Sequence, residues 1–129
     1  MLLYSKDTKD CADITYKIQD DRLILGDDEW YSYHINEHIN KGSIQIFNTN
    51  RGEFIFVDEE GWSKIQILNA SMDLPKSIDI RASEGTHLVC KKSDLSTKNL
   101  GKIFSIKNIR KNTYSVKLTN GHIINFKII

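Results

Sequence analysis

Residues Gly101 to Ile129 read GKIFSIKNIRKNTYSVKLTNGHIINFKII, and they alternate apolar with polar side chains more regularly than the rest of the chain. Two runs within this stretch, 114–119 and 123–128, place apolar side chains at every second position, which is the period of a half-buried strand. Asn120-Gly121 lies between the runs and is a strong hairpin signal. The stretch therefore predicts an antiparallel hairpin.

The register of this hairpin depends on the length of its loop. A two-residue loop would place Val116 opposite Asn125 and mix apolar with polar positions on one face. A three-residue loop, 119–121, would gather an apolar face, and Gly121 could then take the left-handed position of a bulge without a Cβ penalty. We therefore predict the longer loop. The expected pairs are Leu118 with His122, Val116 with Ile124, and Tyr114 with Phe126.

Alternating runs bounded by turn residues recur along the rest of the chain. The run 103–109 should be the strand before the hairpin, with Phe104 and Ile106 together on its apolar side. A weak helical turn is expected at 34–41, and 93–100 should be a loop or a single helical turn. Further strands are expected at 13–19, 22–25, 30–35, 43–47, 53–57, 62–68, 77–82 and 86–90.

This pattern predicts one all-β domain over residues 1–129, either a small antiparallel barrel or a sandwich. About nine to ten short strands are expected, with at most one short helix. A length of 129 residues suits one core, and nineteen isoleucines against three alanines favour strand over helix.

The sequence has no visible secretory signal and no apolar run long enough to cross a membrane. We therefore expect a cytoplasmic protein without a membrane partner, in which Cys11 and Cys90 are free thiols.

Charge is distributed unevenly, although the formal net charge is only +1. Residues 1–61 hold thirteen acidic and six basic side chains, a balance of −7, while 62–129 hold four acidic and twelve basic ones, a balance of +8. Such a division is expected either where the halves attract each other within one domain or where each half meets a different partner.

No catalytic, cofactor or metal motif is present. The sequence lacks a phosphate-binding glycine loop, a nucleophile elbow and a C-x-x-C pair, so we expect no enzyme activity, no catalytic residue and no cofactor. His34 and His38 lie four residues apart, but the sequence supplies no clear third ligand, so no metal site is predicted. The acidic residues near turns are interpreted as solvated rather than as a carboxylate pair for glycoside hydrolysis.

The favoured function is protein binding, because acidic residues stand directly before aromatic ones at two places. Tryptophan is a favoured interface anchor, and an acidic rim would steer a cationic partner toward it. The specific hypothesis is an immunity or antitoxin protein that blocks a basic toxin, for example a nuclease. The predicted partner-binding residues are Asp27, Asp28, Glu29, Trp30, Asp58, Glu59, Glu60 and Trp62.

Two alternatives stay open. The basic half resembles in composition the groove of a small nucleic-acid-binding barrel, with Phe104 and Tyr114 among its lysines, although Tyr114 is expected in the core and the pI is only 7.8. The chain could also be a structural subunit of a larger assembly. The sequence does not define the partner or the oligomeric state.

Overall fold

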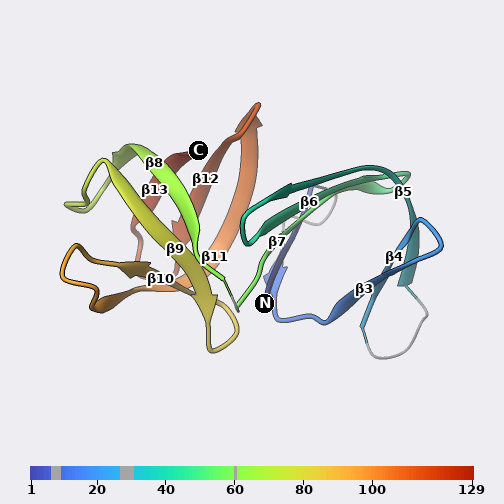
Figure 1. Ribbon diagram of the computed structural model, residues 1–129, viewed down its shortest axis with the longest axis horizontal. Helices are drawn as coiled ribbons and strands as arrows, with labels where there is room; N and C mark the ends of the chain where they lie inside the picture. The colour runs from blue at the N-terminus through green and yellow to red at the C-terminus, as the bar shows by residue number, and fades with distance from the viewer. Residues whose placement is uncertain (7–9, 27–30, 60) are drawn as a thin grey trace.

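The computed structural model describes residues 1–6, 10–26, 31–59 and 61–129 (Figure 1). The described residues form thirteen strands, all paired antiparallel, and no helix that could span a membrane. The strands are β1 (Leu2–Ser5), β2 (Cys11–Ala12), β3 (Tyr16–Gln19), β4 (Arg22–Leu25), β5 (Tyr31–Lys41), β6 (Ile44–Thr49), β7 (Gly52–Val57), β8 (Ser63–Ala70), β9 (Ser77–Ser83), β10 (His87–Lys91), β11 (Thr97–Arg110), β12 (Thr113–Leu118) and β13 (Ile123–Ile128).

The all-β prediction is confirmed, but the expected strand count was too low and the expected helical turn is wrong. Residues 34–41 belong to β5, a strand of 11 residues, and 97–100 begin β11, a strand of 14 residues. The two unexpected strands, β1 and β2, lack alternation because β1 is apolar on both sides and β2 has only two residues. Neither therefore carries the period-two signal.

The strands form two sheets that follow one another in the chain (Figure 1). Strands β8 to β13 form a closed six-stranded barrel, in which each strand pairs with the next and β13 returns to β8. Strands β1 to β7 form an open seven-stranded sheet in the order β2-β1-β7-β6-β5-β4-β3. This sheet curls, and we call it the curled sheet. The chain passes from the sheet to the barrel between Val57 and Ser63, the region where the charge balance changes sign.

The hairpin β12–β13 has the predicted register. Tyr114 lies opposite Phe126 and Val116 opposite Ile124. The loop closes with the Leu118 amide donating to the His122 carbonyl at 2.8 Å, and Gly121 has the left-handed φ of +92° that the loop requires.

The predicted face of Phe104 is wrong, because β11 carries a bulge at this point. Ile103 lies opposite Leu118 and Ser105 opposite Lys117, which leaves Phe104 as the extra residue. A bulge shifts the alternation by one position. Ile103 and Ile106 therefore face the core, while Phe104 faces outward with 62% of its surface exposed.

The hydrophobic core has two parts. The larger part fills the barrel and continues into one face of the curled sheet, where Ile44, Ile55 and Val57 pack with the barrel residues. The smaller part lies on the opposite face and includes Phe47 and Phe56, with ring centroids 5.8 Å apart. The central strands of the sheet are thus covered on both faces, which explains why residues 54–57 are apolar and buried without alternation.

Candidate functional site

Five of the eight predicted partner-binding residues lie outside the described residues: Asp27, Asp28, Glu29, Trp30 and Glu60. The other three, Asp58, Glu59 and Trp62, lie on the segment that joins the curled sheet to the barrel. Asp58 is half-buried just after β7, and its backbone amide donates to the Ser43 carbonyl at 2.9 Å.

Glu59 takes part in contacts that join the two sheets. Its carboxylate accepts hydrogen bonds from the amino group of Met1 and, at 3.3 Å, from the backbone amide of Gly85 in the β9–β10 turn. The hydrogen bond to the amino group lowers the pKa of the Glu59 carboxyl. The same amino group lies 3.7 Å from an Asp13 carboxylate oxygen. Glu59 therefore links the acidic half to the basic half through Gly85, while Asp13 contacts Met1 within the acidic half.

Trp62 also contacts cations of its own chain. The guanidinium carbon of Arg81, on β9, lies 4.6 Å from the centre of the Trp62 ring, and Nζ of Lys91, on β10, lies 5.3 Å from it. These are cation–π distances. The indole is half-buried and stabilises the start of the barrel. Its assignment as a partner-binding residue stays a prediction.

The basic half offers a more open surface on β11, β12 and β13. Residues 95–129 contain seven Lys and Arg side chains and no Asp or Glu. Lys107 on β11 pairs with Ser115 on β12, while Lys117 pairs with Ser105 on one side and with Ile123 of β13 on the other. All five side chains, together with Tyr4 of β1, line a hollow of about 290 Å³. We call this surface the basic face.

Phe104 adds an aromatic ring to the basic face. Its ring is largely exposed, and Nζ of Lys117 lies 5.7 Å from the ring centroid. Tyr114, the other aromatic residue considered in the basic half, is only 2% exposed and packs on Phe126 with ring centroids 5.8 Å apart. The basic face therefore combines lysines, hydroxyl groups and one exposed ring. The Phe104 ring lies on this face because of the bulge in β11.

The curled sheet has a hollow of its own, which sequence reasoning missed. It measures about 320 Å³, and Tyr31, Tyr33, Phe54 and Arg51 are among its lining residues. Tyr31 is 59% exposed, and the rings of Tyr33 and Phe54 lie 4.9 Å apart. The aromatic cluster after Glu29 was visible in the sequence, but its meeting with Phe54 depends on the pairing of β5 with β6 and of β6 with β7.

No cluster of three or more potential metal ligands occurs in the described part of the chain. His34 and His38 lie along the extended strand β5, where four residues span about 13 Å at ~3.3 Å each, rather than on one helical turn. His38 instead stacks on Phe47 with ring centroids 4.3 Å apart and lies 2.6 Å from the Gln45 amide oxygen. Cys11 and Cys90 are both free cysteines.

Comparison with protein-family models, with curated proteins and with solved structures finds no match to this chain. Its function must therefore be argued from its own geometry.

Proposed function

We propose that this protein binds single-stranded nucleic acid through the basic face of its barrel, in the cytoplasm. The observation that carries the proposal is the exposed ring of Phe104 within a stretch of chain that has seven cationic side chains and no carboxylate side chain. An exposed aromatic ring beside a line of cations is the arrangement on which single strands are commonly bound, since bases stack and phosphates pair with lysine.

The layout of the basic face supports this choice. Ser105, Lys107, Ser115 and Lys117 line one hollow, so hydroxyl and ammonium donors converge there for sugar and phosphate oxygens. Phe104 is directly beside this group in the chain, and Lys117 lies against its ring. A base stacked on Phe104 would therefore bring its phosphate to Lys117.

The test is fluorescence anisotropy with a labelled oligothymidylate of about twelve nucleotides. We expect binding at low salt, with an affinity that falls linearly in log salt. Phe104→Ala should weaken binding about tenfold through lost stacking. Lys117→Gln should also weaken it and reduce the salt slope by about one.

Lys64→Gln is the matched control, because Lys64 is an exposed lysine on β8, a strand outside the basic face. Its affinity should stay close to that of the wild type. Absence of binding at low salt, or equal affinity of Phe104→Ala and wild type, would contradict the proposal.

A second proposal keeps the immunity-type function, in which the acidic half binds a cationic protein. The observation that favours it is the aromatic hollow around Tyr31 and Phe54, which lies on the half with a charge balance of −7. An exposed tyrosine is a typical interface anchor, and the excess of acidic side chains in this half would steer a cationic partner toward it.

This second proposal is tested by affinity purification from native cells, followed by binding measurements on the partner that is identified. Replacing Asp58, Glu59 and Glu60 together by Asn, Gln and Gln should slow association, and Tyr31→Ser should speed dissociation. An acidic partner protein would contradict this proposal. Unchanged association and dissociation rates in both variants would contradict it as well.

A further inference from the structure

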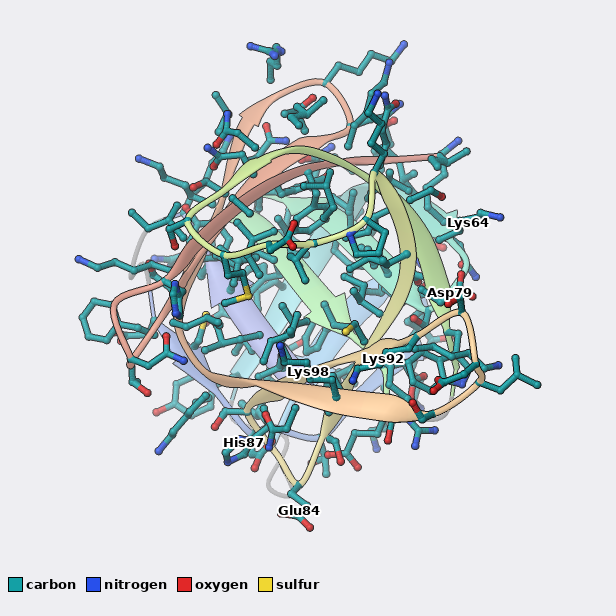
Figure 2. The ribbon with its side chains drawn as sticks, turned by 90° about the vertical axis from the view of Figure 1, so that its left-hand side faces the viewer. Lys64, Asp79, Glu84, His87, Lys92 and Lys98 are labelled. Atoms are coloured by element: carbon teal, nitrogen blue, oxygen red, sulfur yellow. The ribbon has the colours of Figure 1, made fainter. Side chains whose placement is uncertain are left out.

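One end of the barrel carries a hollow that none of the functions above uses. It measures about 230 Å³ and lies beside the β10–β11 turn. Leu74, Ile78 and Cys90 supply its apolar part, and Lys92 and Lys98 line it with Ser93. In Figure 2 the labelled Lys92 and Lys98 lie within the outline of the barrel, whereas Lys64, Asp79, Glu84 and His87 lie at its periphery.

The strand register explains why two lysines point here. Cys90 faces the barrel interior, and Lys98 lies directly opposite it on β11, so both side chains start on the inner side of the sheet. Lys92 follows Cys90 by two positions and leaves the chain on the same side. An inward position in the middle of a barrel would bury a charge, but at the open end both ammonium groups keep contact with water.

The turn between these lysines is locally fixed and strained. The Asp94 carboxylate accepts hydrogen bonds from the amide and the hydroxyl of Ser96, at 2.9 and 2.5 Å. Leu95 at the tip has a left-handed φ of +68°, an uncommon conformation for a residue with a Cβ, and it is 74% exposed. Strain of this kind is often retained where it positions a binding group.

The charges in the hollow are unbalanced. Lys91, Lys92 and Lys98 line it against a single carboxylate, Asp73, while Asp94 lies in the adjacent turn, where the hydrogen bonds from Ser96 and the charge of Lys92 lower the pKa of its carboxyl. Among the described residues neither Lys92 nor Lys98 forms an ion pair. Lys91 lies over Trp62. Burial raises the pKa of the Cys90 thiol, while the charges of Lys98 and Lys92 act in the opposite direction.

We propose that this end of the barrel binds a small organic anion, with its carboxylate between Lys92 and Lys98 and a short apolar chain against Leu74 and Ile78. A volume of 230 Å³ equals about eight water molecules at ~30 Å³ each, which fits an acid of about six carbons. The apolar wall excludes a bare phosphate as the best ligand, since it would leave that wall without a partner.

The test is a titration of the ¹⁵N-labelled protein with hexanoate, monitored by amide chemical shifts. Hexanamide is the matched neutral probe. We expect saturable shifts confined to the β10–β11 turn, the 71–78 segment and the start of β11, with much weaker binding of hexanamide. Lys98→Gln and Lys92→Gln should each weaken hexanoate binding about tenfold, as expected for loss of one charge-assisted hydrogen bond.

Two controls separate this site from the basic face. Lys127→Gln, on β13, and Phe104→Ala should leave hexanoate binding unchanged, and the lysine variants should retain the thermal midpoint of the wild type because their side chains are exposed. Equal binding of hexanamide, shifts spread over the whole surface, or equal weakening by Lys127→Gln would overturn the proposal.

Discussion

The curled sheet and the barrel are both antiparallel, yet they use their charges differently. In the sheet, the carboxylates of Asp13 and Glu59 lie against the amino group of Met1, and Glu59 also binds the β9–β10 turn of the barrel. On β11, β12 and β13 of the barrel, Lys107 and Lys117 have no acidic side chain within their own strands. Acidic side chains of the sheet are thus engaged by the amino group of Met1 and by a backbone amide of the barrel, whereas we propose that the lysines of the basic face bind an anion.

The two units also differ in how they bury their strands. Barrel strands such as β12 and β13 are covered mainly on one side, so buried and exposed side chains alternate along them. The central strands of the curled sheet are covered on both sides, because one face packs on the barrel and the other forms its own cluster. The shared cluster implies that the two units unfold together.

The largest expected effect comes from the shared core. Phe126→Ala should reduce the free energy of unfolding by about 3–5 kcal/mol, since the ring is fully buried. Urea unfolding followed by circular dichroism and by fluorescence should give one coincident transition. Phe104→Ala is the matched control and should change stability by no more than about 0.5 kcal/mol. A separate, unshifted transition of the curled sheet would show that the units fold independently.

A smaller effect is expected at the buried hydrogen bonds between the units. The Ser63 hydroxyl accepts from the Ser43 amide at 2.7 Å and lies 2.5 Å from the Ser43 hydroxyl. Ser63→Ala leaves that amide buried without its partner and should cost about 1–3 kcal/mol. Ser43→Ala keeps the amide paired and should cost less. Equal losses of stability in the two variants, measured by thermal unfolding, would contradict the role given to the hydrogen bond from the Ser43 amide.

Alkaline pH should weaken the barrel through Tyr114. Burial raises the pKa of its hydroxyl to about 12, from an ordinary value of 10.0. The unfolded chain therefore loses this proton first, so stability is complete below pH 10 and falls as pH rises toward 12. Tyr114→Phe should flatten this decline in urea titrations between pH 9 and 11. An unchanged slope would contradict the assignment.

The smallest effect is expected from Glu59 at acid pH. Its pKa is lowered, chiefly by the hydrogen bond to the amino group of Met1, so its contribution is present above the ordinary pKa of glutamate and is lost as pH falls below it. The carboxylate is partly exposed, which keeps the contribution modest. Glu59→Gln should reduce the acid dependence of the thermal midpoint. If the thermal midpoint of the wild type and that of the variant depend on acid pH in the same way, the Glu59 carboxylate does not stabilise the junction.

Sequence reasoning succeeded where local pattern and turn chemistry agree. The register of β12 and β13 follows from alternation and from the glycine at 121, and both are local properties. It failed where tertiary packing overrides local pattern. The 34–41 segment has no clear strand period, yet it forms β5 because it can pair with β4 and β6.

The candidate site was also only partly predictable from the sequence. The basic composition of the second half was visible in the sequence, and so was Phe104. The exposure of its ring was not, because one bulged residue reverses the side on which Phe104 lies. The hollow in the curled sheet depends on side chains from strands distant in sequence, so no spacing rule could have found it.

The central claim is that the basic face, and not the curled sheet, meets a nucleic acid. The most direct test is an amide chemical-shift map of the ¹⁵N-labelled protein titrated with oligothymidylate at low salt. The account predicts shifts centred on Phe104, Lys107 and Lys117, with residues of β3 to β6 unchanged. Shifts centred on the curled sheet, or no shifts at low salt, would contradict it.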